Sequence, residues 1–517
     1  MKATADGWAG GTFSNPVIPG FHPDPSICRV GEDYYLVCSS FEYFPGVPVF
    51  HSKDLVHWEQ IGNVMERPAQ LRLPDTAPSS GGVYAPTLRY HDGRFWLITT
   101  DVSHDGNVLF SAADPAGPWS DPVRLPGVKG IDPDLAWDED GRCWVTTAGI
   151  SQIAIDPGTG QTIGAPRRLW SGTPGAKAPE APHLYRIGDH WYLLIAEGGT
   201  ERGHGISIAR GPAPYGPFEP CPDNPVLSHR STDLEIQNTG HGDLVQAPDG
   251  SWWLVFLGVR PGGGSPGWHV LGRETFLAPV TWTVGGTSRT EPGGGWPVIG
   301  AATPAMAAPP WPPRPVPAPP ARDDFDAARL HPHWLSVRSR PEGYFSTTER
   351  PGWLTLRARG ASLDDQAVTF AGRRQQDRSC RARTLIDPGV GLGGLAVRLD
   401  ERHHYAVEAA GAGTVRVVAR IGPLRQTLGE RRVPAGPVTL RIDISAPTET
   451  WDPRQGPDVL RLGVEGPDGE LEVLAELDGR YLSTEVAGGF TGRVIGMYAA
   501  EGTVRFDWFA LEAGDKE

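Results

Sequence analysis

Five short segments rich in aromatic residues recur in the first part of the chain, and a turn precedes each of them. They are residues 33–37, 93–97, 141–145, 189–193 and 250–254. Successive segments lie about 47 to 61 residues apart, which is the length of a four-stranded antiparallel sheet with its loops. Five units of this length predict a five-bladed β-propeller. A generic β-sandwich in which aromatic residues cluster by chance is the alternative.

The hydrophobic pattern changes after residue 322 to a regular alternation of apolar and polar positions. Alternation of this kind is typical of strands with one buried face. The clearest examples are residues 353–357, 395–399, 415–417, 438–444 and 504–509. Polar turns separate these segments. The pattern predicts two packed antiparallel sheets, a β-sandwich of the jelly-roll or lectin-like kind, so the whole chain is expected to be all-β.

A proline-rich segment separates the two patterns. Residues 301–321 read AATPAMAAPPWPPRPVPAPPA, a composition that favours an extended, semi-rigid backbone. We therefore expect a propeller domain over residues 12–300, a linker over residues 301–322 and a sandwich domain over residues 323–514. A long irregular loop within a single domain is the alternative interpretation of the proline-rich segment.

Composition and charge exclude several classes of protein. The 517-residue chain is 39% hydrophobic and contains 18 Trp, so it can bury a core and is not globally disordered. Its 67 Gly and 52 Pro interrupt nearly every stretch long enough for three helical turns, which argues against a helical bundle. The net charge of −14 disfavours nucleic acids and anionic membranes as partners. The sequence has no run of 18 apolar residues, so we expect no membrane span.

The cysteines and the first residues bear on where the protein works. The five Cys are odd in number and scattered, and no two have the spacing of a metal or redox motif. This indicates reduced thiols rather than a disulfide framework or a zinc site. Residues 1–7 lack the apolar stretch of a secretion signal. We expect a cytoplasmic protein, and a secreted protein whose signal has been removed is the alternative.

Polar residues stand in phase with the aromatic repeat. Asp24, Asp132, Glu180 and His241 each lie ten to twelve residues before the aromatic residues of their unit, and Tyr84 takes this place in the second unit. Equivalent positions of successive blades converge on the axis of a propeller, so these side chains are expected to line one funnel. A single Asp-Pro pair is common in turns, but repetition in phase across three units indicates a functional site.

The neighbouring residues predict how the carboxylates are held and what they can do. Asp24 and Asp132 precede proline, which predicts an extended backbone at both positions. Glu180 lies between Pro179 and Pro182, so its backbone is expected to be stiff. Carboxylates near one axis repel each other, and the pKa of at least one of them should rise. Such a difference in pKa supplies an acid and a base at a single pH.

Longer motifs extend over nearly the whole chain. They lie at residues 15–26 (NPVIPGFHPDPS), 41–47 (FEYFPGV), 51–55 (HSKDL), 180–185 (EAPHLY), 197–200 (EGGT), 271–275 (LGRET), 323–326 (DDFD) and 373–376 (RRQQ). In these motifs the chain resembles the β-xylosidases and α-L-arabinofuranosidases of glycoside hydrolase family 43. The subgroup that it resembles carries a C-terminal β-sandwich.

The resemblance implies a role for each carboxylate. Asp24 is the general base, Glu180 is the general acid, and Asp132 tunes the pKa of the acid and positions it. The family inverts configuration, because the base activates a water while the acid protonates the leaving oxygen. Asp134 is the rival for the role of Asp132, but we expect Asp134 to lie in a surface turn.

Four further residues match substrate-binding positions of the family. Arg273 would contact the sugar in the first subsite, with an ion pair to Glu274 as the alternative. His241 would orient the general base or hold a water. The alternative is that it helps to bind calcium on the axis, although a lone histidine is a poor calcium ligand. No cofactor is expected to be required. Phe41 and Tyr84 would form apolar walls for the sugar ring, or would belong to the propeller core.

Two departures from the family pattern bear on sugar preference. Many β-xylosidases of this group close the pocket with a phenylalanine from the sandwich, and the place where we expect it holds Val494. Residues 233–238 (DLEIQN) also differ. The leading prediction is an inverting exo-glycosidase that removes terminal β-1,4-xylosyl residues from xylo-oligosaccharides. An α-L-arabinofuranosidase, or a bifunctional enzyme, acting on arabinosides is the first alternative.

Two alternatives come from other classes of protein. One is a non-catalytic carbohydrate-binding protein, and the other is a propeller that serves as a scaffold for proteins. Neither needs three carboxyl groups in phase, which is why we favour the enzyme. The sequence is compatible with a homo-oligomer but does not predict one.

Overall fold

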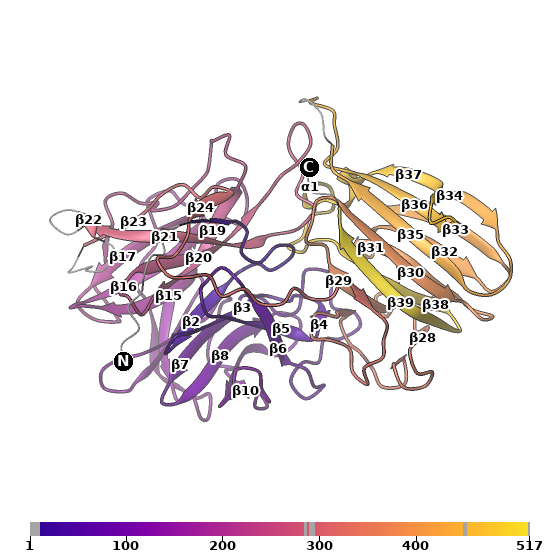
Figure 1. The fold of residues 1–517 in the computed structure, drawn as a ribbon. Helices are drawn as coiled ribbons and strands as arrows, with labels where there is room; N and C mark the ends of the chain where they lie inside the picture. Colours follow the sequence, from indigo (N-terminus) through magenta and orange to yellow (C-terminus); the bar gives the residue numbers. More distant parts are fainter. Residues whose placement is uncertain (1–10, 284–286, 289–294, 448–451, 515–517) are drawn as a thin grey trace, which may run out of the picture.

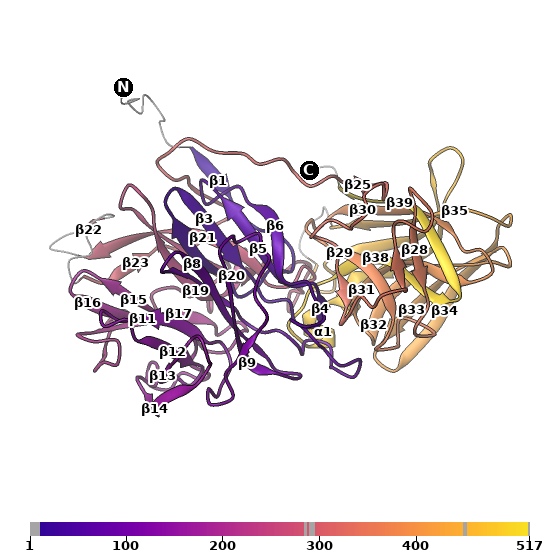
Figure 2. The same cartoon turned by 90° about the horizontal axis from the view of Figure 1, so that it is seen from below.

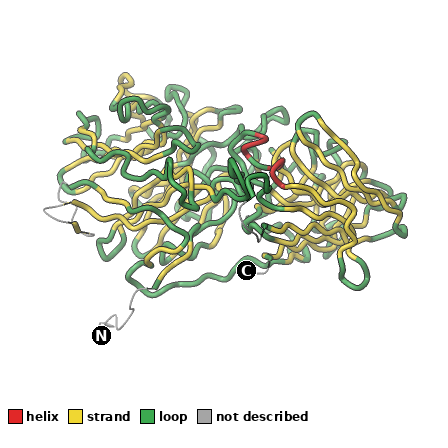
Figure 3. The backbone as a smooth tube through the Cα atoms, turned by 90° about the horizontal axis from the view of Figure 1, so that it is seen from above, coloured by secondary structure: helices red, strands yellow, loops and turns green. Residues whose placement is uncertain are grey.

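The computed structural model describes residues 11–283, 287–288, 295–447 and 452–514. Two units built of strands lie side by side (Figure 1). The helical segments of the described residues are the short η1 (Gly479–Leu482) and α1 (Thr484–Ala487), which lie at the junction of the two units (Figure 3). Residues 1–7, on which the expectation about a secretion signal rests, fall outside the described ranges. In the described residues, no helix is long and apolar enough to cross a membrane.

The first unit is a five-bladed β-propeller, as predicted, and each blade is an antiparallel sheet of four strands with β23 added to the last. In chain order the blades are β2 (Ser26–Val30), β3 (Asp33–Val37), β5 (Gly46–Ser52) and β6 (Glu59–Met65); β7 (Thr87–His91), β8 (Arg94–Asp101), β9 (Gly106–Ala112) and β10 (Val123–Arg124); β11 (Asp134–Trp137), β12 (Cys143–Thr147), β13 (Ser151–Ile155) and β14 (Thr162–Arg168); β15 (Glu180–Ile187), β16 (His190–Glu197), β17 (Gly205–Gly211) and β18 (Glu219–Pro220); and β19 (Gln237–Gln246), β20 (Trp252–Val259), β21 (Glu274–Thr283), β22 (Thr287–Ser288) and β23 (Pro297–Ile299).

The aromatic repeat marks the same strand in every blade. Each predicted segment forms the second strand, and a hairpin joins it to the first strand. A glycine with positive φ occupies that hairpin in all five blades, where a side chain would strain the turn: Gly31, Gly93, Gly141, Gly188 and Gly250. The first strands contact one another in ring order, and β19 contacts β2 to close the ring. The residues that begin the first strands therefore face a common axis.

One buried polar network joins all five blades beneath this axis. Arg89 of the second blade donates to Asp243 of the fifth (2.8 Å) and to Asp134 of the third (3.0 Å). Asp243 also accepts from Ser26 of the first blade (2.7 Å) and from Tyr185 of the fourth (2.5 Å). The expectation that Asp134 lies in a surface turn is therefore wrong. Its carboxylate is fully buried because it pairs with Arg89 at the hub of the ring.

The second unit is a β-sandwich, which also confirms the predicted fold class. One sheet contains β25 (Arg322–Asp323), β27 (Phe345–Ser346), β28 (Leu354–Arg357), β39 (Thr503–Ala513), β30 (Cys380–Asp387), β35 (Val438–Ser445), β36 (Val459–Glu465) and β37 (Leu471–Asp478); the other contains β29 (Thr369–Arg374), β38 (Val494–Glu501), β31 (Leu392–Asp400), β32 (His403–Ala410), β33 (Thr414–Ile421) and β34 (Leu424–Arg432). Inward-facing residues of both sheets form one apolar core.

The proline-rich segment runs along the edge of the propeller from β1 (Thr12–Ser14) towards β25 in the sandwich (Figure 2). It is not free of the propeller. Within it, β24 (Ala305–Ala307) pairs with β1, and Trp311 packs edge-on against Trp253 at 6.2 Å between ring centroids. The segment thus fastens the two ends of the propeller chain before it enters the second unit.

The two units share a continuous apolar interface. Strand β4 (Tyr43–Phe44) of the propeller pairs with β26 (Ser336–Val337) of the sandwich. Around this pair, Phe21 and Phe41 pack with Phe370 and Val494 in a single buried cluster. Burial of this kind is typical of one packed body rather than of tethered modules. The sandwich is therefore positioned to contribute to a site on the propeller.

All five cysteines lie in the described residues. Each is buried and unpaired. Burial raises the pKa of the Cys38 thiol to about 12, so it is not a reactive thiolate at neutral pH.

Candidate active site

The three predicted carboxylates begin the inner strands of three blades. Asp24 lies two residues before β2, Asp132 lies two residues before β11, and Glu180 is the first residue of β15. Asp24 and Asp132 are 4% and 8% exposed, and Glu180 is half-buried. The charges of Asp24 and Glu180 both act on Asp132, and the charge of Asp24 acts on Glu180. The structure thus brings the three carboxyl groups together in one electrostatic unit.

The backbone at these positions differs from the prediction. Asp24 and Asp132 have φ values of 55° and 52°, and His241 has 45°, so the expected extended conformation is wrong. Proline disfavours the right-handed helical region for the residue before it, but that restriction leaves positive φ open. The carbonyl before each aspartate accepts an N–H from just beyond the second strand of the same blade, at 3.2 and 2.8 Å. These bonds hold a tight turn, and such strained residues cluster at active sites.

Asp24 is held in its ionised form. Burial alone raises the pKa of its carboxyl, but Arg273, His241 and Ser39 together outweigh burial and lower that pKa below its ordinary value. The Arg273 guanidinium donates at 2.7 Å, the Ser39 hydroxyl donates at 2.5 Å, and the His241 ring nitrogen lies at 3.5 Å. A buried carboxylate with these partners is an acceptor poised to take a proton from a water.

Glu180 and Asp132 are shifted in the opposite direction. Burial and then the charge of Asp24 raise the pKa of Glu180 to about 7. Burial, the charge of Glu180 and the charge of Asp24 raise the pKa of Asp132 well above its ordinary value. The cluster therefore combines one carboxyl group whose ionised form is favoured by its surroundings with two whose protonated form is favoured. This is the division of labour that acid–base chemistry needs.

These shifts predict a bell-shaped dependence of kcat/KM on pH. The base must be ionised, so activity is lost as pH falls through the pKa of Asp24, which lies below 3.8. The acid must be protonated, so activity is lost as pH rises through the pKa of Glu180, about 7. Initial rates from pH 3 to pH 10 measure both limbs, provided that stability is checked at each pH. An alkaline limb near pH 10, where tyrosine and lysine titrate, would exclude Glu180 as the acid.

Arg273 lies at the centre of this cluster. Besides its bonds to Asp24, its guanidinium donates to the Thr200 hydroxyl at 3.2 Å and to the backbone carbonyl of Phe490 at 3.4 Å. The alternative of an ion pair with Glu274 is wrong, because Glu274 accepts two bonds from Arg260 at 2.7 and 2.8 Å. Arg273 therefore links the ionised aspartate to the sandwich.

Three aromatic rings stand beside the carboxylates. Phe41 and Tyr84 are 5.2 Å apart between ring centroids, and Phe490 lies 5.8 Å from Phe41 and 6.0 Å from Tyr84. Arg273 sits over the rings of Phe41 and Phe490 at 5.6 and 5.5 Å. A hollow of about 600 Å³ lies against Tyr84 and Phe490. Together the rings form an apolar wall of the kind that supports a sugar ring.

Sequence analysis missed Phe490 and looked for a sandwich phenylalanine at Val494 instead. Val494 is fully buried in strand β38, where it belongs to the core between the two units. Phe490 precedes that strand in a glycine-rich loop, and its side chain remains 36% exposed. Its N–H donates to the Ser80 hydroxyl at 2.8 Å. The signal available in the sequence was a phenylalanine with glycines on both sides, close to the expected position.

The described side chains around His241 do not supply the oxygen ligands that calcium prefers. Burial lowers the pKa of His241 to about 3 and that of His204, a neighbour that sequence analysis missed, to about 4, so both rings are neutral. The nearby oxygen ligand, Asp24, is already engaged by Arg273 and Ser39. Across the described ranges, no group of three or more His, Cys, Asp or Glu side chains is arranged to hold a metal ion. Calcium prefers six to eight oxygen ligands, so this donor set does not fit it.

Comparisons with known proteins identify both units. Residues 13–288 match the model of the glycosyl hydrolases family 43, and residues 322–512 match the beta xylosidase C-terminal concanavalin A-like domain. The non-reducing end alpha-L-arabinofuranosidase BoGH43B of Bacteroides ovatus is 41% identical over 98% of this chain and 95% of its own length. A xylosidase/arabinosidase of Butyrivibrio fibrisolvens is 39% identical over 71% of this chain and 73% of its own.

Solved structures show the same architecture over the full length. The structure titled Bacteroides ovatus xyloglucan PUL GH43B superimposes with a TM-score of 0.88 at 38% identity, covering 98% of this chain and all of that one. The GH43 protein BlXynB of Bacillus licheniformis gives 0.87 at 32% identity with the same coverage. The propeller and the sandwich thus occur together in known relatives, and the chain belongs to glycoside hydrolase family 43.

Proposed function

We propose that the protein is an inverting, exo-acting glycosidase that releases pentose residues from the non-reducing ends of xylo-oligosaccharides or arabinosides. The observation that carries this proposal is that Asp24, Asp132 and Glu180 begin the inner strands of three blades, with Arg273 bonded to Asp24 at 2.7 Å. Arg273 helps to lower the pKa of Asp24, whereas burial and the charge of Asp24 raise the pKa of Glu180 to about 7. Neither a simple sugar-binding site nor a protein scaffold needs carboxyl groups arranged in this way.

Each residue then has one task. Asp24 takes a proton from a water that attacks the anomeric carbon, and Glu180 gives a proton to the leaving oxygen. Asp132 accepts a backbone N–H from Ala181, the residue after the acid, and so helps to position Glu180. Arg273 orients Asp24, and its one N–H without a partner among the described residues, on Nε, is left for the sugar. No step in this scheme requires a metal ion.

The aromatic wall and its hollow hold different parts of the substrate in this scheme. The sugar to be released would lie beside the carboxylates, next to Tyr84 and Phe490, because Phe41 is only 2% exposed and supports these rings from the core. The rest of the substrate leaves through the hollow beside Tyr84 and Phe490. An exo-acting enzyme is the natural outcome, because the inner end of the funnel is closed by the polar hub that joins the blades.

Terminal β-1,4-xylosyl residues are our first choice of substrate, in keeping with the phenylalanine that the sandwich places in the pocket. A second candidate is α-L-arabinofuranosidase activity. The observation that favours it is the 41% identity, over 98% of this chain, to a relative named for that activity. The two sugars present similar shapes to such a funnel, and an enzyme that accepts both is within the proposal.

A panel of nitrophenyl glycosides tests the proposal. We expect turnover of the β-D-xylopyranoside, the α-L-arabinofuranoside or both, and no turnover of the β-D-glucopyranoside, whose extra hydroxymethyl group the closed pocket would reject. We also expect the same rates after treatment with EDTA. Failure on both pentosides would refute the proposed function, and a loss of activity in EDTA that calcium restores would refute the metal-free scheme.

A further inference from the structure

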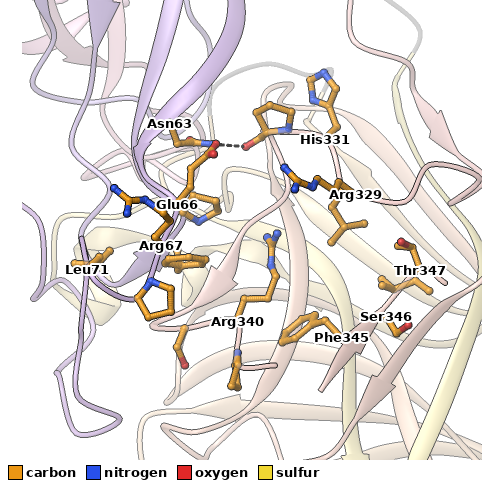
Figure 4. A pocket seen from close by; sticks show the side chains of 18 of the residues that line it. Asn63, Glu66, Arg67, Leu71, Arg329, His331, Arg340, Phe345, Ser346 and Thr347 are labelled. Carbon is orange, nitrogen blue, oxygen red and sulfur yellow. Dashed lines mark hydrogen bonds between the residues drawn. The ribbon is translucent and has the colours of Figure 1, made fainter. Parts of the chain in front are cut away.

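A second concave site lies between the propeller and the sandwich, apart from the catalytic cluster. Its volume is about 1070 Å³, at the upper end of the roughly 300–1,000 Å³ typical of ligand sites. One wall comes from residues 63–73 at the end of β6 and beyond it, and the other comes from residues 328–332 and 339–348 of the sandwich. Figure 4 shows the side chains of both walls facing the same space. The described lining residues include none of the catalytic carboxylates and no part of the aromatic wall.

Positive charge gathers in this interdomain cavity. Arg67 and Arg72 come from the propeller, and Arg329 and Arg340 come from the sandwich. Glu66 is the single carboxylate among the described lining residues. The chain as a whole carries a net charge of −14, so this concentration of arginine runs against its general character. An anionic group is the natural partner for such a site.

The arginines are available to a ligand. Arg340 donates only to neutral oxygens of this chain, the Ser336 hydroxyl at 3.0 Å and the Trp334 carbonyl at 2.8 Å. Within the described ranges, neither Arg340 nor Arg329 forms an ion pair with a carboxylate. Burial lowers the pKa of Arg340 to about 10, which still leaves it charged at neutral pH. Arg67 pairs with an exposed aspartate at 3.0 Å, and exposed pairs of this kind contribute little and exchange readily.

The cavity also offers what a sugar ring needs. The guanidinium of Arg340 lies over the ring of Phe345 at 5.8 Å, and Leu71 adds apolar surface on the opposite wall (Figure 4). Hydroxyl groups of Ser346 and Thr347 line the same space. Sugars pack their C–H faces on aromatic rings and bond hydroxyl groups at the rim. A site for a bare inorganic anion would need only the arginines.

We propose that the interdomain cavity is a second carbohydrate-binding site that recognises oligosaccharides bearing carboxylate groups, such as uronic acid substituents on a xylan backbone. The arginines bind the carboxylate, and Phe345 supports a sugar ring. Polyanions such as nucleic acids are disfavoured by the acidic surface around the cavity. The choice of a xylan backbone rests on the proposed function; the recognition of an acidic sugar rests on the cavity alone.

Calorimetric titration of the full chain carrying Glu180→Gln, which is expected to slow the cleavage of xylo-oligosaccharides by about 10²- to 10⁴-fold, tests the proposal. The probes are xylotriose with one glucuronosyl group, unsubstituted xylotetraose and inorganic phosphate. We expect the acidic probe to bind one site more than xylotetraose does. Combined Arg329→Gln and Arg340→Gln substitutions should weaken that additional event at least tenfold and leave the binding of xylotetraose unchanged. The additional event should also weaken as salt is raised.

Controls separate the cavity from charge in general and from folding. Arg432→Gln removes an exposed arginine on β34 that is not among the described residues lining the cavity. It should leave the binding of all three probes unchanged. Arg329→Gln alone removes an exposed side chain and should still weaken the additional event about threefold or more. Equal stoichiometry for the acidic and neutral probes would overturn the proposal. So would complete displacement of the acidic probe by an equal concentration of phosphate, because that result describes an anion site without sugar recognition.

The result is independent of the catalytic assignment. Turnover of nitrophenyl pentosides by the chain with Arg329→Gln and intact Glu180 should equal that of the unsubstituted protein. If the unsubstituted protein cleaves no pentoside, the proposed function fails, but the additional binding event can still be observed. If pentosides are cleaved and the additional event is missing, only the cavity proposal fails.

Discussion

Replacing Asp24 with asparagine is expected to lower kcat by about 10²- to 10⁴-fold, because an amide cannot take a proton from the attacking water. The fold should persist. Asparagine has nearly the same shape, and the turn that holds residue 24 is also fixed by a backbone hydrogen bond. Steady-state kinetics and the melting temperature of the same preparation measure the two effects. Asp114→Asn, at an exposed loop position, is the matched control and should behave as the unsubstituted protein.

The same substitution should leave a second trace. The charge of Asp24 is one of the causes that raise the pKa of Glu180. Without that charge, the pKa of Glu180 falls, and the alkaline limb of the residual activity should move to lower pH. Near-normal turnover by Asp24→Asn would exclude Asp24 as the base. A low activity whose alkaline limb stays in place would mean that the two carboxyl groups are not coupled as described.

Replacing Glu180 with glutamine should give the second largest effect, and its size should depend on the leaving group. Alkyl glycosides and xylobiose have poor leaving groups. For these substrates, loss of the acid is expected to lower kcat by about 10²- to 10⁴-fold. Aryl glycosides with acidic phenols need little protonation and should lose far less. Rates for a series of phenols plotted against leaving-group pKa measure the difference.

The plot distinguishes catalysis from structure. A steep dependence on leaving-group pKa that is absent from the unsubstituted protein identifies Glu180 as the proton donor. An equal loss on good and poor leaving groups would instead show that Glu180 holds the substrate or the fold. The substitution should also abolish the alkaline limb near pH 7, since that limb reports the proton on Glu180.

The propeller could be predicted because its sequence repeats a physical constraint. Every blade needs a hairpin that only glycine fits easily, followed by a strand with a buried aromatic residue, as at Gly93 and Phe95. Side chains at one place in that repeat meet at the axis, which is how Asp24 and Glu180 could be found together. The sandwich could be predicted for the same reason. Each of its strands buries one face, so apolar and polar residues alternate along it.

The hub of the ring was present in the sequence but was not recognised. Ser26, Asp134 and Asp243 each lie two residues after an in-phase position, and all three point into the network around Arg89. In a strand, residues two apart share a face, so this spacing was a usable signal. Asp134 was instead taken for a surface residue, because a charged side chain is rarely buried unless it is paired. Its partner, Arg89, comes from another blade.

Other features depend on contacts that no local pattern contains. Phe490 reaches the pocket only because strand pairing across the interface brings the sandwich against the propeller. The positive φ at Asp24 belongs to a turn that is held by a hydrogen bond from the N–H of Ser39, just beyond β3, to the carbonyl of Pro23. The Asp-Pro sequence does not reveal this bond. His204 lies outside the in-phase positions and meets Asp24 only through the closure of the ring.

The central claim is that Asp24 and Glu180 act from opposite sides of one funnel, and stereochemistry tests it most directly. Their blades are not neighbours in the ring, since β2 contacts β7 and β19 but β15 contacts β11 and β19. An inverting pair needs about 6.5–9.5 Å between carboxyl groups to admit a water, whereas a retaining pair needs about 5–5.5 Å. Proton NMR during the first minutes of hydrolysis of a β-xyloside should therefore show α-xylose before mutarotation. Early appearance of β-xylose would contradict the role of Asp24 as a base and the mechanism built on it.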